Sequence, residues 1–182
     1  MIRFVLTSSK LKKLLIFILI ITLIPKIGFT KAYKADFYYP SGDGPFPVVI
    51  MSHGKGGPSL TYHKKAEGAT RNGRAAIVLD HYSARGKYGN KFQNFPKISD
   101  GKKWREKDLI DLLKSLNDKP KINRKKIILS GWSAGAGMVL PFISQPKTID
   151  LPKDIMVVGA ILTYPYTYGC YERITSFNVP TL

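Results

Sequence analysis

Short apolar runs alternate with longer amphipathic segments along most of the chain, and this alternation predicts an α/β protein. Runs rich in β-branched and aliphatic residues predict strands over 35–39, 48–51, 75–80, 126–129 and 155–163. Apolar side chains at helical spacing predict helices over 60–72, 104–116 and 134–143. Parallel strands need crossover connections, so this order of elements favours a mainly parallel sheet with helices on both faces.

One serine lies between a predicted strand and a predicted helix. Residues 129–137 read Leu-Ser-Gly-Trp-Ser-Ala-Gly-Ala-Gly, which places Ser133 in a G-x-S-x-G frame. With a strand before it and a helix after it, this frame is the nucleophile elbow of α/β-hydrolases. Gly131 and Gly135 leave room for neighbouring backbone, and free N–H groups at the helix start point toward developing negative charge. We expect Ser133 to be a nucleophile and the Ala134 N–H to bind an oxyanion.

A glycine-rich loop follows the predicted strand at 48–51. It reads His53-Gly54-Lys55-Gly56-Gly57. In α/β-hydrolases, an HG-containing loop after an early strand supplies the second backbone N–H of the oxyanion hole. We therefore expect Gly54 or Lys55 to be that donor and the His53 ring to orient the loop. A plain glycine-rich loop is the alternative, which the presence of both motifs in the right order disfavours.

Three segments together resemble the dienelactone hydrolase family of α/β-hydrolases: HGKGG at 53–57, LDHYSARG at 79–86 and GWSAGAG at 131–137. The resemblance extends from about residue 34 to residue 182 and implies an α/β-hydrolase fold. The family includes enzymes whose nucleophile is cysteine, whereas this elbow has serine, which implies more general ester chemistry. The substrate of dienelactone hydrolase itself is not implied.

Four side chains are candidates for lining a substrate pocket. His53 and His81 follow predicted strands that end at the same edge as the elbow. Arg85 is expected to pair with Asp80 or, as the less favoured alternative, with an anionic substrate. Tyr164 follows the last predicted strand and is expected to shape the pocket. His81 is also the one candidate for a replacement general base, although simple packing is the default interpretation for all four.

The acid and the histidine of a catalytic triad are missing after Ser133. In this fold the order along the chain is Ser, then Asp or Glu, then His, but His53, His63 and His81 all precede the serine. In the family that the chain resembles, a segment like 179–182 (VPTL) opens the next strand, and the acid and histidine come later. We therefore expect residues 33–182 to be a partial α/β-hydrolase domain, incomplete at its C-terminus, with an unpaired edge on the strand at 155–163.

Two classes of function follow. The first is an exported serine hydrolase of the dienelactone hydrolase type, acting on a small-molecule ester or related acyl bond, whose acid and histidine are not in this chain. The second is a non-catalytic product, either a truncated hydrolase fragment or a basic binding protein.

The N-terminus has the pattern of a secretory signal. Basic residues at 3, 10, 12 and 13 precede an apolar run over 14–24, which Pro25 ends. Small residues at Thr30 and Ala32 predict cleavage after Ala32. We expect a signal peptide over 1–32 and a secreted or periplasmic protein, with an uncleaved membrane anchor as the alternative.

The chain is strongly basic, with a net charge of +17. Residues 1–32 carry six of the 29 basic and none of the 12 acidic side chains, so the remainder still has a net charge of +11. This charge favours an anionic surface such as membrane headgroups or cell-wall polymers, with an ordinary solvated surface as the alternative. Nucleic acid is not expected as a partner, because the basic residues are scattered and match no binding module.

No cofactor or metal is expected. The sequence has neither of the glycine-rich nucleotide-binding motifs, G-x-x-x-x-G-K-[ST] and G-x-G-x-x-G. The histidines lack carboxylate or cysteine neighbours at the spacing of metal ligands. Cys170 is the single cysteine, so no disulfide can form within the chain.

Overall fold

The computed structural model describes residues 33–86, 98–144, 149–165 and 177–182, all within the compact unit Lys31–Leu182. The predicted signal sequence and Cys170 lie outside these residues. Among the described helices, none is long and apolar enough to cross a membrane.

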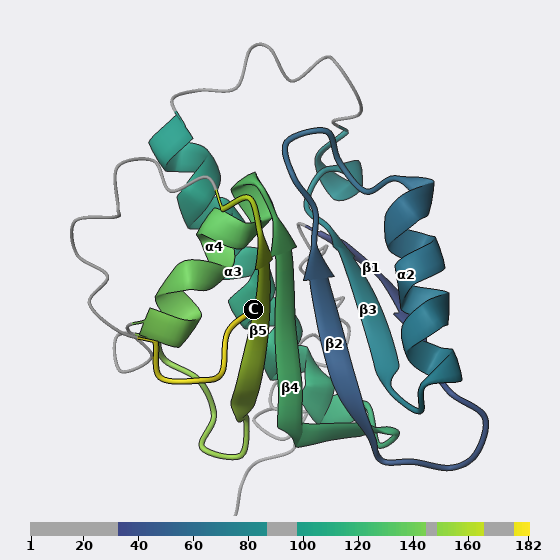
Figure 1. Ribbon diagram of the computed structural model, residues 1–182. Helices are drawn as coiled ribbons and strands as arrows, with labels where there is room; N and C mark the ends of the chain where they lie inside the picture. Colours follow the sequence, from purple (N-terminus) through teal and green to yellow (C-terminus); the bar gives the residue numbers. More distant parts are fainter. Residues whose placement is uncertain (1–32, 87–97, 145–148, 166–176) are drawn as a thin grey trace, which may run out of the picture. The chain divides into compact units, whose positions relative to one another are not determined.

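The described elements form a mainly parallel sheet with helices on both faces, as the pattern predicts (Figure 1). Strand order is β1-β3-β2-β4-β5; β1 is antiparallel to β3, and the other neighbours are parallel. The strands are β1 (Lys34–Tyr38), β2 (Phe46–Ser52), β3 (Ala75–Asp80), β4 (Ile122–Trp132) and β5 (Val157–Thr163). The helices are α2 (Leu60–Arg71), α3 (Ile98–Ser115) and α4 (Ala134–Ser144), with 3₁₀ turns at Ser83–Arg85 and Leu116–Asp118.

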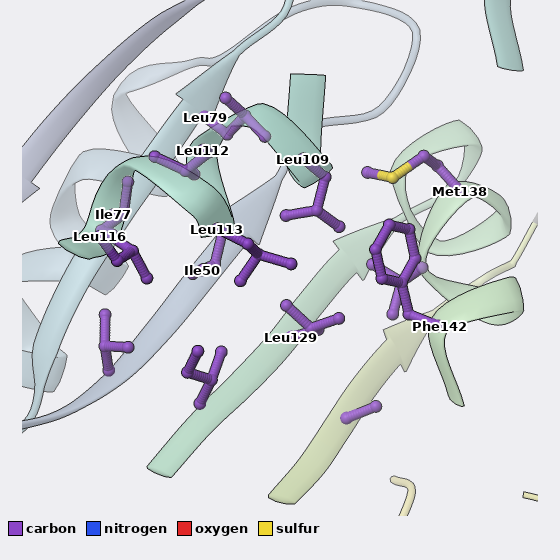
Figure 2. Packing of buried hydrophobic residues seen from close by; sticks show 14 of the residues in the cluster. Ile50, Ile77, Leu79, Leu109, Leu112, Leu113, Leu116, Leu129, Met138 and Phe142 are labelled. Atoms are coloured by element: carbon purple, nitrogen blue, oxygen red, sulfur yellow. The ribbon is translucent and has the colours of Figure 1, made fainter. Parts of the chain in front are cut away.

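The larger apolar core lies between the sheet and the helices α3 and α4. Leucines at helical spacing along α3 and the following turn pack against alternate residues of β2, β3 and β4, and Met138 and Phe142 of α4 extend this layer (Figure 2). Each fully buried side chain of this kind contributes about 1.5–3 kcal/mol to stability. The leucines of α3 and its following turn are Leu109, Leu112, Leu113 and Leu116.

The opposite face of the sheet packs against α2. Val49 and Met51 of β2 and Val78 of β3 form this smaller core with Ala66 of α2. Because β2 and β3 are covered on both sides, their sequences are continuous apolar runs rather than alternating ones.

Two elements run past their predicted ends. Strand β4 begins at Ile122, whose side chain is buried and whose backbone is in register with Phe46, before a register shift; the polar residues after it stay in the strand. Helix α4 continues through Pro141 to Ser144. The buried side chains of Phe142 and Ile143 are part of the core, which favours helix beyond the proline.

The expected unpaired edge of β5 is partly covered. Residues 180–182 run parallel to β5, with hydrogen bonds from the Ala160 N–H to the Pro180 carbonyl (2.9 Å) and from the Leu162 N–H to the Leu182 carbonyl (2.7 Å). The prediction of an open edge was therefore wrong for this stretch. Exposed apolar side chains do remain on β5, since Val158 and Ile161 are 38% and 37% exposed.

Candidate active site

The carboxyl ends of the parallel strands meet at one edge of the sheet, where Ser133 lies directly between β4 and α4. Its backbone is left-handed, with φ of 50°, and the residue is exposed. The Ser133 N–H donates to the Thr163 carbonyl (2.8 Å), and its carbonyl accepts from the Gly137 N–H (3.0 Å). Hydrogen bonds from β5 and from α4 thus fix the Ser133 backbone, while the residue itself remains exposed.

The two glycines of the motif permit close contacts between backbones. A Cβ on Gly135 would lie 2.3 Å from the Ser52 carbonyl oxygen, and one on Gly131 would lie 2.5 Å from the Ala136 nitrogen. Neither neighbour is a flexible side chain, so no larger residue fits without moving main chain. The sequence interpretation of these glycines is therefore confirmed by the structure.

The loop after β2 passes beside the elbow. A Cβ on Gly54 would lie 3.5 Å from the Ser133 Cβ, which places the two backbones next to each other. The Gly54 N–H donates to the hydroxyl of Tyr62 on α2 (3.1 Å). Lys55 is exposed, and within the described ranges its N–H has no hydrogen-bond acceptor.

His53 is a buried, neutral side chain that fixes this loop. Its Nδ1–H donates to the Gly54 carbonyl (2.6 Å), and its Nε2 accepts the His81 N–H (3.2 Å). A single tautomer satisfies both bonds. Burial, with a smaller effect of Arg105, lowers the His53 pKa from 6.5 to about 2. The expected orienting contact is present, but the fully buried ring does not line an open pocket.

His81 belongs to a buried network and not to the solvent-facing site. Its Nδ1–H donates to Asp108 Oδ2 (2.8 Å), and its Nε2 accepts from the Ser52 hydroxyl (2.9 Å). The sequence of hydrogen bonds from Ser52 to His81 to Asp108 resembles that of a Ser-His-Asp triad. All three residues are at most 1% exposed, however, so substrate cannot reach Ser52. Burial, followed by Arg105 and Arg85, lowers the His81 pKa well below its usual value.

The pocket-lining role suggested for His81 was therefore wrong, and the less favoured alternative, a replacement base for Ser133, is excluded as well. Both of its ring nitrogens are already hydrogen-bonded, and the ring is fully buried.

Arg85 pairs with Asp108, so the expectation that it would pair with Asp80 was wrong. Its two terminal nitrogens each lie 2.8 Å from an Asp108 carboxylate oxygen, and Nη1 also donates to the His81 carbonyl (2.6 Å). Burial raises the Asp108 pKa, and Arg85 opposes that rise. Asp80 instead accepts the N–H groups of Tyr82 (2.8 Å) and Ser83 (3.1 Å), because it caps the turn that follows β3.

The sequence interpretation missed the polar residues of α3. Arg105 donates to the His53 carbonyl (2.9 Å) and the Gly54 carbonyl (3.3 Å), while Asp108 binds the loop after β3. Residues three apart lie on one helix face, so α3 contacts both loops. The sequence does contain this signal, an Arg and an Asp directly before the leucines of α3.

Tyr164 directly follows β5, beside the Thr163 carbonyl that binds the elbow. It has a left-handed φ of 49° and a side chain 86% exposed. In the described part of the chain, no group of three or more His, Cys, Asp or Glu side chains is placed to bind a metal ion.

The likeness of this chain to known proteins lies in its fold. No protein-family model and no curated protein matches the sequence. Solved structures do match its arrangement of strands and helices. The chain has the α/β-hydrolase fold.

Three matches show how far this α/β-hydrolase likeness extends. A dienelactone hydrolase-like promiscuous phosphotriesterase from metagenomic libraries has a TM-score of 0.58 at 15% identity, over 72% of this chain and 53% of its own. An esterase from Thermogutta terrifontis has a TM-score of 0.54 at 20% identity, over 73% and 49%. A sugar hydrolase from Lactococcus lactis has a TM-score of 0.52 at 20% identity, over 81% and 56%. The chain spans about half the length of these structures.

Proposed function

We propose that this chain carries the nucleophile and the oxyanion-binding half of an exported serine hydrolase acting on ester or related acyl bonds. The observation that carries the proposal is the exposed Ser133, with its left-handed backbone beside the Gly54 backbone. The fold of dienelactone hydrolase-like proteins and esterases supports it, because their fold places a nucleophile at this strand-to-helix turn.

In the proposed reaction, Ser133 Oγ attacks the carbonyl carbon of the substrate, and the carbonyl oxygen becomes an oxyanion. The N–H of Ala134, the first residue of α4, is one donor for this charge. Lys55 is the better second donor, because the Gly54 N–H is already bonded to Tyr62.

The general base and its acid are proposed to come from sequence that follows residue 182 in a longer form of the protein. His53 and His81 are buried with both ring nitrogens hydrogen-bonded, so neither is available to Ser133. The matched structures are about twice as long as the part that this chain covers. An in-frame Asp and a later His in the downstream nucleotide sequence would support this proposal.

Labelling by a fluorophosphonate probe and turnover of p-nitrophenyl esters test the proposal on the full 182-residue chain. Without a base, the serine keeps its proton, so we expect little or no turnover and weak labelling. That labelling should disappear in Ser133→Ala and persist in Ser59→Ala, because Ser59 is exposed and makes no side-chain capping bond. No labelling at Ser133 under any condition would favour the non-catalytic fragment. Robust turnover would place a base within this chain.

Export is proposed from the N-terminal pattern alone. The basic start followed by the apolar run at 14–24 should direct the chain out of the cytoplasm. Cell fractionation with immunoblotting should find a shortened product in the periplasm or medium, or an intact product in the membrane if the signal acts as an anchor. Intact, soluble chain in the cytoplasm would contradict export.

A further inference from the structure

Arg105 of α3 lies behind the loop that passes the elbow. It is 5% exposed, and its guanidinium donates to two consecutive carbonyls, those of His53 (2.9 Å) and Gly54 (3.3 Å). The same guanidinium donates to the Tyr82 hydroxyl and lies 4.8 Å from the centre of the Tyr82 ring. A guanidinium holds its donors in a rigid planar fork and so binds both carbonyls and the Tyr82 hydroxyl in a fixed geometry, whereas the donors of a lysine ammonium lie on a single rotating nitrogen.

The direction of these carbonyls determines the direction of the N–H groups after them. In a trans peptide, the C=O and the following N–H point to opposite sides. The carbonyls of His53 and Gly54 point toward α3, so the N–H groups of Gly54 and Lys55 point away from it. The Gly54 N–H bond to Tyr62 agrees, because α2 covers the opposite face of the sheet. Adjacent N–H groups on one side form a concavity that binds anions.

We propose that Arg105 is a positioning residue for the oxyanion hole, keeping the Lys55 N–H aimed at the oxyanion formed at Ser133. This inference rests on the proposed function. His53 Nδ1–H binds the Gly54 carbonyl as well (2.6 Å), so two buried donors fix the orientation of the Gly54–Lys55 peptide. Arg105 itself does not contact substrate.

The test uses a thiol at the elbow, because a thiol reacts without a general base far more readily than a hydroxyl. Ser133→Cys is made in a Cys170→Ser background, which removes the only other thiol. With p-nitrophenyl acetate, the thiolate attacks the carbonyl carbon, a thioester forms and p-nitrophenolate leaves, so an oxyanion develops. With iodoacetamide, the thiolate displaces iodide and no oxyanion forms. The ratio of the acylation to the alkylation rate therefore reports the oxyanion hole.

Arg105→Met in this background should lower the ratio of acylation to alkylation rates about ten- to a hundredfold. The upper value is about the effect of losing one oxyanion donor completely. Alkylation should remain near the parent rate, and Arg105→Lys should restore part of the ratio. Arg74→Met is the matched control, because Arg74 is exposed and donates to the Asn72 carbonyl, away from the elbow. Its ratio should equal that of the parent.

An unchanged ratio in Arg105→Met, or an equal loss of both rates, would overturn the positioning role and leave Arg105 as a structural residue. A parent ratio no higher than that of a small free thiol would instead contradict the proposed function. If circular dichroism shows that Arg105→Met is unfolded, Tyr82→Phe replaces it, since this variant removes one partner of the guanidinium and keeps the ring. The ratio should then fall several-fold, and an unchanged ratio would again overturn the proposal.

Discussion

Acid should destabilise this protein through its two buried histidines. Protonating His53 at Nε2 would direct a charged donor at the His81 N–H, which already donates to that atom. The His53 pKa is lowered to about 2, and the His81 pKa is also lowered well below its usual value, in both cases mainly by burial. A histidine whose pKa is lower in the folded state binds fewer protons there than in the unfolded chain. Its stabilising effect is complete above the unfolded pKa of about 6.5 and is lost as the pH falls below it.

The size of the loss is set by the unfolded pKa. At pH 5, about 1.5 units below that pKa, protonation of the unfolded chain at His53 should lower the free energy of unfolding by about 2 kcal/mol. The folded pKa of His53 is too low to alter this figure. His53 alone therefore predicts a loss of about 2 kcal/mol between pH 7.5 and pH 5, and His81, whose pKa is also lowered, adds to this loss; a typical total stability is only about 5–15 kcal/mol. The raised pKa of Asp108 has the opposite sign and reduces the loss as that carboxylate takes up a proton.

Urea unfolding at pH 7.5 and pH 5, followed by the fluorescence of Trp104 and Trp132, measures this loss directly. Replacing one titrating ring by His53→Gln lowers stability at both pH values and should reduce the difference between them by about 2 kcal/mol. A free energy of unfolding that changes by less than about 1 kcal/mol over this range would refute the argument, because it would mean that the rings are not held neutral by the fold.

Three further results are expected. Gly135→Ala should lower the free energy of unfolding by about 3 kcal/mol or more in a thermal or urea titration, because its Cβ would lie 2.3 Å from the Ser52 carbonyl oxygen. Gly56→Ala is the control, because no atom lies within 4 Å of a Cβ at that position. Equal losses in the two variants would contradict the steric reason. Ser133→Gly should raise stability by up to about 1 kcal/mol while abolishing labelling, since φ of 50° costs serine energy, and an unchanged melting temperature would count against strain at the elbow. The chain should self-associate through the exposed apolar side chains of β5, so Ile161→Lys should reduce association in sedimentation velocity; unaltered association would exclude this surface.

The element pattern and the elbow could be predicted from the sequence because both are local. Burial on both faces requires a continuous apolar run along β2 and β3 up to the polar residues that end them, Ser52 and Asp80, and the leucines of α3 recur at helical spacing. The contact at Gly131 is local, because the turn between strand and helix brings the Ala136 nitrogen against it, whereas Gly135 meets the Ser52 carbonyl of β2 and so depends on how that strand packs. The strand β4 exceeded its apolar run because its backbone pairs with Phe46 at the buried Ile122, on the far side of four polar residues that interrupt the run.

The partners of the polar side chains were decided by the tertiary structure. Asp80 lies next to His81 and near Arg85 in the sequence, yet Asp108, more than twenty residues away, binds both. In the same way, Arg105 of α3 binds the His53 and Gly54 carbonyls of the loop beside the elbow, about fifty residues away in the sequence. Packing of the α3 leucines against the sheet fixes the rotation and depth of that helix, and residues three apart on one face then reach two strand-end loops together. Local sequence determines which residues form strands, helices and turns, whereas hydrogen bonds between distant polar groups depend on how the elements pack.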